Sequence, residues 1–351
     1  SLLWKTSLDN KKKLLKTHRN IKIHLVKSIN IFYPFAFIFH VFQLITFFKK
    51  SDEKYTFIHA RADYTQFIVL ISRFIHKINS VWDCRGDSIS EIKHSLTKKN
   101  IIYKIYGFLY IIPFFKFLIY INLVYSKAII FVSKLLKKNL LKLFNSKSKS
   151  CVVPCLVNHK LFFYDSNLRK LMRKKYNIKN NETVFVYSGS MVAYQSFEHQ
   201  RNFYKNLFAN KNNILLILTN QIKKAEKFFD QFQKSKVIIK SVEFNEVNNY
   251  FNMSDFAILI RDNNLLNQVA SPTKFGEYCL SCLKVLMNKN VRQSYRNALR
   301  INNFVRLNNF SLNNTNSETR SLISTKSRKY YCRDNYVGDY KSLYETIIDY
   351  K

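Results

Sequence analysis

Short apolar segments of strand length alternate along this chain with longer segments that carry apolar residues at helical spacing. This alternation occurs in two successive series. Strands that alternate with helices are typical of parallel sheets, because a parallel connection needs a crossover. The expected strands are residues 20–27, 55–59, 80–82, 128–132 and 152–153, then 183–187, 214–219, 237–239, 256–260 and 284–287. The sequence therefore predicts an α/β fold with two doubly wound domains that face a cleft.

The helices expected between these strands are apolar or amphipathic. They are residues 34–50, 63–77, 101–125 and 133–149, then 197–210, 221–235, 245–252 and 274–283. A polar and basic segment at about 164–182 separates the two halves, and apolar residues at helical spacing close the chain. We expect an N-terminal domain over 1–163 that is truncated at its start, a C-terminal domain over 164–330, and a closing helix within 331–351.

The balance of charge is strongly positive. The 351 residues include 58 Lys and Arg against 22 Asp and Glu, a formal net charge of +36. Because hydrophobic residues make up 47% of the chain, it can bury a core and is not a disordered basic protein. The charge indicates an anionic partner, and it leaves nucleic acid, a membrane surface and a phosphorylated substrate open; a solubilising basic surface is the alternative.

The six cysteines give no sign of a disulfide framework or a zinc site. Six in a chain of this length are too few for a disulfide scaffold. Cys279 and Cys282 form a single CxxC, with no second pair and no histidine at zinc spacing. The sequence therefore predicts no structural metal.

Two aromatic, apolar stretches, residues 29–48 and 105–124, are long enough to cross a bilayer. Each carries a proline, Pro34 or Pro113, and polar residues within the stretch. Such residues are costly inside a membrane, so a buried helix is favoured over a spanning one. A helix that lies on the membrane surface without crossing it is the other alternative.

Polar residues follow several of the expected strands, where ligands bind in α/β sheets. Ser188, Gly189 and Ser190 follow one strand, and either a phosphate loop or a plain turn fits them. The segment 271–274, SPTK, opens an expected helix: Ser suits the N-cap and Pro suits the first helical position. A cation at a helix N-terminus favours an anion site there, with a simple capping box as the alternative.

The first half has a comparable group after its short strands. The residues His59 and Arg61 follow one strand, and the segment 83–87, DCRGD, follows the next. Arg61 and Arg85 are candidates for the mouth of the cleft, where guanidinium groups bind phosphate or acidic sugars. A surface ion pair between Arg85 and Asp87 is the alternative.

Taken together, these segments resemble a known family. The run VASPTKFGEY at 269–278 is similar to the helix-opening signature "SPTKF-x-EYL-x-x-G-x-PVI" of GT-B glycosyltransferases of the family 4 type. Further matches in the same order are IHAR at 58–61, WDCRGD at 82–87, VPC at 153–155 and YSGS at 187–190. The resemblance implies two Rossmann-like domains facing a nucleotide-sugar cleft, with a C-terminal helix crossing back.

The resemblance also implies an activity. Such a hexosyltransferase moves a sugar from a nucleotide-sugar donor to a saccharide or lipid-linked acceptor, retains the anomeric configuration and needs no metal or other cofactor. Cell-surface polysaccharide or lipopolysaccharide synthesis is the expected setting. We expect a cytoplasmic enzyme held peripherally at the inner face of the membrane, where basic residues meet anionic lipid.

Site residues follow from the same resemblance. Lys274 and Arg85 are the expected catalytic cations, because the leaving nucleoside diphosphate develops negative charge. Glu277 is expected to hold the ribose hydroxyls. The full donor-binding set is Ser188, Gly189, Ser190, Ser271, Thr273, Lys274 and Glu277, and the acceptor or cleft set is His59, Arg61 and Asp87.

The sequence departs from the family pattern at several positions. The family carries a second acid eight residues before the one at Glu277, where this chain has Val269. The family also has cations soon after its "Y-x-G" turn, and residues 191–195, MVAYQ, have none. An inactive relative acting as a partner subunit is therefore an alternative function. A nucleic-acid-binding protein is a weaker one, because the lysines are spread along the chain and no nucleic-acid-binding motif is present.

Overall fold

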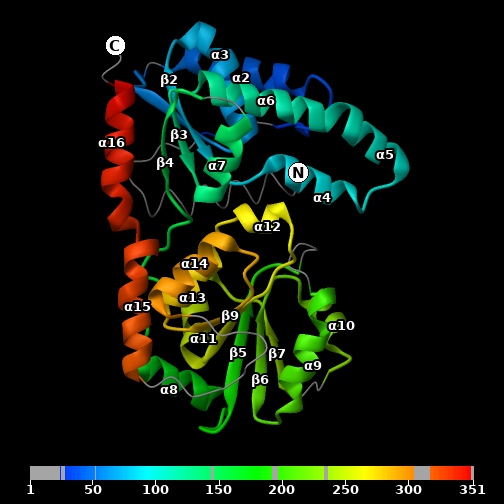
Figure 1. Cartoon of the computed structure of the whole chain (residues 1–351), viewed down its shortest axis with the longest axis vertical. Helices are drawn as coiled ribbons and strands as arrows, with labels where there is room; N and C mark the ends of the chain where they lie inside the picture. The colour runs from blue at the N-terminus through cyan, green and yellow to red at the C-terminus, as the bar shows by residue number, and fades with distance from the viewer. Residues whose placement is uncertain are drawn as a thin grey trace.

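The computed structural model describes residues 24, 28–51, 53–143, 146–191, 197–232, 236–303 and 317–348, which form two α/β units one above the other (Figure 1). The first unit has a parallel sheet in the order β1-β2-β3-β4. Its strands are β1 (Phe57–Arg61), β2 (Asn79–Cys84), β3 (Ala128–Phe131) and β4 (Lys149–Val152). The second unit has a parallel sheet in the order β7-β6-β5-β8-β9. The two parallel sheets agree with the predicted fold class.

The second sheet determines where a ligand can bind. Its strands are β5 (Thr183–Ser188), β6 (Asn213–Leu218), β7 (Val237–Lys240), β8 (Phe256–Leu259) and β9 (Lys284–Met287). The chain builds outward from β5 to β7 on one side, and then returns to place β8 and β9 on the other side. The direction of winding reverses between β5 and β8, and ligands bind beyond the carboxyl ends of strands at such a switch point.

Helices cover both sheets. Those of the first unit are α2 (Ala36–Lys50), α3 (Asp63–His76), α4 (Ser88–Leu96), α5 (Ile101–Tyr106), α6 (Ile112–Tyr125) and α7 (Lys134–Leu143). Those of the second unit are α8 (Ser166–Lys175), α9 (Arg201–Ala209), α10 (Ile222–Phe229), α11 (Val247–Met253), α12 (Leu265–Val269), α13 (Thr273–Leu280) and α14 (Arg292–Ile301). A π-helical stretch, η1 (Gly107–Ile111), joins α5 to α6. At Gly107 a Cβ would come 2.5 Å from the Leu96 side chain, so glycine there lets α4 pack closely.

Aromatic side chains fill the cores between the sheets and their helices. In the first unit, Trp82 of β2 and Phe131 of β3 are fully buried beside Leu118 and Leu123 of α6. In the second unit, the rings of Phe185 and Phe256 on neighbouring strands stack with centroids 5.2 Å apart. These strands are buried on both faces, which is why they read as continuous apolar runs.

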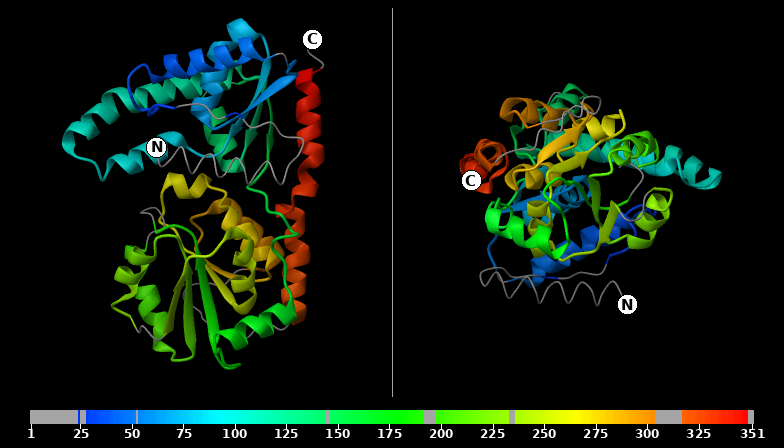
Figure 2. Two further views of the ribbon diagram at one scale, coloured as in Figure 1. Left: turned by 180° about the vertical axis from the view of Figure 1, so that it is seen from behind. Right: turned by 90° about the horizontal axis from the view of Figure 1, so that it is seen from below.

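The chain crosses between the units twice. It leaves β4 through residues 153–165 to enter the second unit, and it returns through α15 (Ser317–Tyr331), a short 3₁₀ turn η6 (Arg333–Tyr336) and α16 (Val337–Ile348). α15 packs on α13, whereas Leu343 and Ile347 of α16 pack on Val81 and Ile130 of the first sheet. Figure 1 and the left view of Figure 2 show these two helices running along one side of both units.

Several predicted elements differ from the structure. The helix expected at 133–149 ends at Leu143, because Lys149–Val152 form β4. Before β4, Ser146 donates a hydrogen bond to the backbone carbonyl of Leu123 and Ser148 donates one to that of Ser126. The strand expected at 20–27 lies, apart from residue 24, outside the described residues.

Two segments read as polar connections contain helices. Residues 261–270, where no helix was expected, include α12, and the basic segment at 164–182 includes α8. Asp165 caps α8 by accepting hydrogen bonds from the backbone N–H groups of Asn167 and Leu168. α8 packs on α11, so this segment belongs to the second unit although few of its residues are apolar.

The apolar stretches give one long helical segment among the described residues. By length and composition alone, Ile101–Tyr125 is long and apolar enough to cross a membrane, and 44% of its most apolar window is buried inside the protein. Leu118 and Leu123 face the core while Phe117 and Val124 are exposed. The other stretch, residues 29–48, corresponds largely to α2, which has 15 residues.

Candidate functional site

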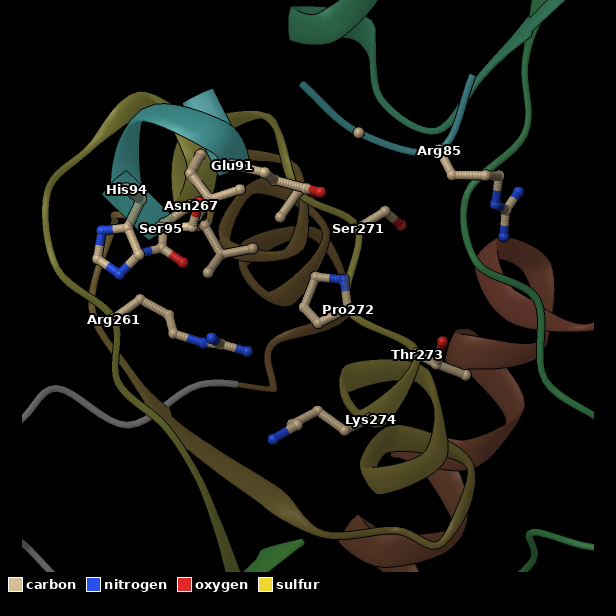
Figure 3. Close-up of a pocket in the computed structure, with 14 residues that line it drawn as sticks. Arg85, Glu91, His94, Ser95, Arg261, Asn267, Ser271, Pro272, Thr273 and Lys274 are labelled. Atoms are coloured by element: carbon tan, nitrogen blue, oxygen red, sulfur yellow. The ribbon is translucent and has the colours of Figure 1, made fainter. Parts of the chain in front are cut away.

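A cleft of about 550 Å³ lies between the two units, at the carboxyl ends of their strands (Figure 3). Residues that follow β2 and residues of α4 line one side, and residues that follow β8 and those that open α13 line the other. The lining residues are Arg85, Gly86, Glu91, His94 and Ser95 from the first unit and Arg261, Leu266, Asn267, Ala270, Ser271, Pro272, Thr273, Lys274 and Val291 from the second.

Lys274 is the second residue of α13, and its ammonium group is directed into the cleft. The Nζ atom lies 4.2 Å from the centroid of the Tyr187 ring. Gly189 has φ 135, a backbone conformation that favours glycine, and a Cβ there would come 2.7 Å from this Nζ, the flexible end of the lysine side chain. Burial and the like charge of Arg261 hold the pKa of Lys274 well below its usual range. An anion in the cleft would therefore stabilise the protonated form of Lys274 and raise its pKa.

Arg261 is a site residue that the sequence analysis did not single out. It follows β8 at the switch point, and its side chain is 7% exposed. Its backbone carbonyl accepts hydrogen bonds from the Nδ2 atoms of Asn288 and Asn290, both 2.7 Å away, which fixes the turn. Figure 3 shows its guanidinium and the Lys274 ammonium directed into the same space. In the sequence, its position after an apolar strand could have indicated a residue at the ligand-binding edge of the sheet.

Glu277 lies one turn further along α13 and is 9% exposed. Burial raises the pKa of this carboxyl to about 7, and the charge of Lys274 opposes that rise. The next residue, Tyr278, accepts a hydrogen bond from the backbone N–H of Ser188 at 2.9 Å. This contact joins α13 to the turn after β5 and brings Ser188 and Gly189 close to Lys274. Of the expected donor residues, only Ser271, Thr273 and Lys274 line the cleft.

The turn before α13 differs in detail from the prediction. The helix begins at Thr273 with Pro272 at the N-cap and no capping side chain, so Ser271 is not the cap. Instead, the Ser271 Oγ accepts a hydrogen bond from the backbone N–H of Cys155 at 3.0 Å. Ser271 thus ties the cleft to the segment that crosses between the units, while Thr273 is exposed in the cleft wall.

Arg85 lines the cleft but is held by Asp83 of the first unit and by Cys155 of the crossing segment. Its Nη1 lies 3.3 Å from Asp83 Oδ1, and its Nη2 donates to the Cys155 Sγ at 3.2 Å. The ion pair is thus with Asp83, and the alternative pair with Asp87 is wrong. Asp87 instead caps α4, accepting hydrogen bonds from the Ser90 backbone N–H and hydroxyl. Figure 3 places Arg85 apart from Lys274, beyond the 271–273 turn.

His59 and Arg61 lie outside the lining of this cleft. The His59 Nδ1 forms a hydrogen bond with the Tyr344 hydroxyl of α16 at 2.8 Å, and its Nε2 lies 3.6 Å from Asp83 Oδ2. Arg61 is exposed at the end of β1. The first unit contributes Glu91, His94 and Ser95 of α4 to the cleft instead, and of these only Glu91 stood near a recognised motif.

Val269, at the position of the family's second acid, is buried against the first unit. Its backbone carbonyl accepts a hydrogen bond from the Ser133 hydroxyl at 2.6 Å. The position therefore serves packing between the units. Of the segment 191–195, only Met191 is described, and its carbonyl accepts a hydrogen bond from Lys224 of α10.

The whole structure is similar to several solved glycosyltransferases. Sucrose-phosphate synthase from Thermosynechococcus elongatus matches with a TM-score of 0.66 at 10% identity, covering 93% of this chain and 81% of that one. HepE of Anabaena, in complex with UDP and glucose, matches with a TM-score of 0.64 at 11% identity, covering 96% and 88%. WaaG, a glycosyltransferase involved in lipopolysaccharide biosynthesis, matches with a TM-score of 0.56 at 12% identity, covering 93% and 80%.

These neighbours are GT-B glycosyltransferases, so the predicted fold class is confirmed. No family model and no curated protein sequence matches the chain. At about one residue in ten identical, the likeness establishes the fold, and function must be argued from the site.

Proposed function

We propose that this chain is a glycosyltransferase that takes a sugar from a nucleotide-sugar donor. The observation that carries the proposal is the pair of cations, Lys274 and Arg261, directed into one cleft at the switch point of the second sheet. Arg261 is buried and Lys274 is partly exposed, and their like charges repel each other. A dianionic diphosphate in the cleft would offset this repulsion between Lys274 and Arg261. The two cations therefore suit the binding of a diphosphate.

The same residues account for catalysis without a metal. As the sugar leaves the donor, negative charge develops on the diphosphate, and positive groups already in place stabilise it. Lys274, Arg261 and the backbone N–H groups at the start of α13 are the positive groups of the cleft. Glu277, one turn below, would accept hydrogen bonds from the ribose hydroxyls. Retention of the anomeric configuration and hexosyl specificity are carried over from the family 4 resemblance.

The acceptor side of the proposal rests on the first unit. His94 and Ser95 of α4 line the cleft opposite the second unit, where a saccharide or lipid-linked acceptor would enter. The neighbour WaaG is described as acting in lipopolysaccharide biosynthesis, which supports a surface glycan as the product class. The inactive-relative alternative is favoured by Val269, because a buried valine replaces the family's second acid.

The first direct test is binding of nucleoside diphosphates, measured by calorimetry and by thermal shift. We expect UDP, ADP or GDP to bind and raise the melting temperature by mass action. Glu277→Gln should weaken binding while Glu243→Gln, in the turn before α11, should not. Failure of every nucleoside diphosphate to bind the folded protein contradicts the proposal. Binding with neither transfer nor hydrolysis of any nucleotide sugar favours the inactive relative.

The titration of Glu277 predicts how that binding depends on pH. The carboxyl has its pKa raised to about 7, and only the ionised form accepts both ribose hydrogen bonds. Affinity should therefore fall by about tenfold from pH 8 to pH 6 as the carboxyl takes up a proton. In Glu277→Gln this component should disappear, leaving the titrations of the nucleotide and of Lys274, whose pKa is lowered. If the affinities of the native protein and of Glu277→Gln depend on pH in the same way, Glu277 does not bind the donor.

We also propose that the enzyme is cytoplasmic and works at an anionic membrane surface. An apolar groove of about 930 Å³ opens between α2, α3 and α6, with Arg73 and Lys77 at its edge. Phe74 is 89% exposed there, and Phe35 and Phe117 are more than half exposed. Exposed aromatic side chains beside cations are typical of a surface that inserts between lipid head groups. This surface supports a lipid-linked acceptor.

Vesicle binding tests the membrane proposal. We expect sedimentation with phosphatidylglycerol vesicles and much less with phosphatidylcholine. Replacing both Phe74 and Phe117 by alanine should weaken it by about tenfold or more, since burying one phenylalanine contributes about 1.5–3 kcal/mol. Phe244→Ala, at an exposed position of the second unit, is the matched control. Equal binding by all three proteins, or a preference for single-stranded nucleic acid over vesicles, would contradict it.

A further inference from the structure

Three metal-ligating side chains meet where the chain crosses between the two units, outside the proposed donor cleft. They are His159, on the segment that leaves the first unit, and Cys332 and Asp334, on the segment that returns to it. One ligand atom from each lies within 4.8 Å of the other two. We propose that these residues form a binding site for a divalent transition metal of the zinc type, which clamps the two crossing segments together.

The backbone explains why these residues meet. Val157 and Cys332 form a parallel β-bridge, and the Val157 N–H donates to the Tyr331 carbonyl at 2.8 Å. The chain then turns at Asn158, whose side chain accepts a hydrogen bond from the Lys160 N–H. The bridge therefore fixes His159 beside the start of η6, although the two segments are more than 170 residues apart in sequence.

The distances suit a tetrahedral ion. The His159 Nδ1 lies 3.1 Å from the Cys332 Sγ and 3.9 Å from the Asp334 Oδ2. Ligands bound to zinc at about 2.0–2.3 Å in tetrahedral geometry stand about 3.3–3.6 Å from one another. The two separations lie on either side of that range, and the Asp334 carboxylate lies within 4.8 Å of the Cys332 Sγ, so rotation of the exposed Asp334 side chain would complete the set. Among the described residues, no other three His, Cys, Asp or Glu side chains come together in this way.

The ligand chemistry narrows the choice of metal. A thiolate, an imidazole and a carboxylate together favour Zn²⁺ or Co²⁺ over Mg²⁺ or Ca²⁺, which prefer oxygen alone. Binding requires the Cys332 thiol to lose its proton to the buffer. The thiolate and the carboxylate then balance the two charges of the ion, so the site is neutral within a strongly basic protein.

Exposure leaves a route for the ion and room for a fourth ligand. Cys332 is buried, His159 is partly buried, and the Asp334 side chain is 75% exposed. A metal can therefore enter from the Asp334 side, and water can fill the fourth position. Because the ligands come from both crossing segments, the bound metal would restrain movement of one unit relative to the other.

Cobalt and zinc titrations of the full chain test the proposal, after treatment with a chelator. Co²⁺ should bind at one equivalent with a thiolate-to-cobalt absorption in the near ultraviolet, and Zn²⁺ should displace it and raise the melting temperature. Cys332→Ser should abolish the absorption. Cys151→Ser, at a partly buried thiol of β4, should leave it unchanged.

Asp334→Asn is the second variant, because its exposed side chain can change without unfolding the protein. It should weaken Zn²⁺ binding by at least about tenfold, since losing even a group behind a ligand has that effect. An absorption that survives Cys332→Ser, or Zn²⁺ affinity unchanged in Asp334→Asn, overturns the proposal. So does the absence of Co²⁺ binding, which would leave a hydrogen bond between Cys332 and His159 as the whole interaction.

Discussion

Replacing Lys274 by methionine is expected to lower kcat for sugar transfer by about 10²–10³, the usual effect of losing one preorganised group that stabilises developing charge. Methionine keeps the length and the apolar stem, so its contact with Tyr187 is retained. The stem is also close to Gly189, which leaves little room for a larger residue. Since the missing charge acts most strongly on the departing diphosphate, kcat should fall more than donor affinity.

Lys170→Met is the matched control, because Lys170 is exposed on α8 at the far end of the second unit. It should transfer sugar at the normal rate. Steady-state kinetics with the donor found in the nucleotide screen gives kcat and KM for both variants. If folded Lys274→Met turns over normally, the cation that stabilises the leaving group is a different residue, and Arg261 is the next to test.

The expected donor-side residues that lie near one another are those at strand ends or at the start of a helix, although Gly189 and Glu277 are outside the cleft lining. Gly189, Lys274 and Glu277 lie just after a strand or at the start of a helix, and parallel strands all end at one edge of the sheet. Their meeting therefore follows from the rhythm of strands and helices. Arg261 also lies just after a strand, β8, so the same pattern predicts that it lies at this edge of the sheet.

The surroundings of His59 and Asp334 could not be predicted in this way. Tyr344, which binds the His59 ring, is 285 residues away in sequence, on a helix that crosses back from the second unit. His159 and Cys332 likewise meet only because the two crossing segments pair. Zinc motifs are recognised by spacing along the chain, and a site assembled across two crossings has no such spacing.

The basic segment at 164–182 shows the same limit in the second unit. Read alone, Arg169 and Arg173 suggest a solvated connection. In the structure both reach the carboxylate of Asp255, which is 6% exposed in the turn before β8. The Arg169 Nη2 lies 2.6 Å from Oδ1, and the Arg173 Nη1 lies 3.3 Å from Oδ2. The ion pairs with the buried Asp255 therefore hold this segment against the second unit as a helix.

Asp255→Ala should consequently destabilise the second unit by about 3–5 kcal/mol, the effect of removing one partner from a buried ion pair. Arg320 of α15 also binds this carboxylate, at 2.8 Å, and is 2% exposed. The backbone N–H of Val184 donates to it as well, at 2.9 Å. Removing the acid leaves these buried donors without their shared acceptor, and neither water nor a nearby side chain can replace it fully.

Urea unfolding followed by circular dichroism measures this loss, with Asp339→Ala on the exposed surface of α16 as the matched control. The control should cost less than about 1 kcal/mol, because it loses only a contact with a helix N-terminus. Replacing Arg320 by leucine in the Asp255→Ala background should recover stability, since it removes the most deeply buried unpaired charge. Equal stabilities for Asp255→Ala and Asp339→Ala would contradict this prediction. They would show that Arg169, Arg173 and Arg320 do not need the Asp255 carboxylate, and that other contacts hold α8 and α15 to the second sheet.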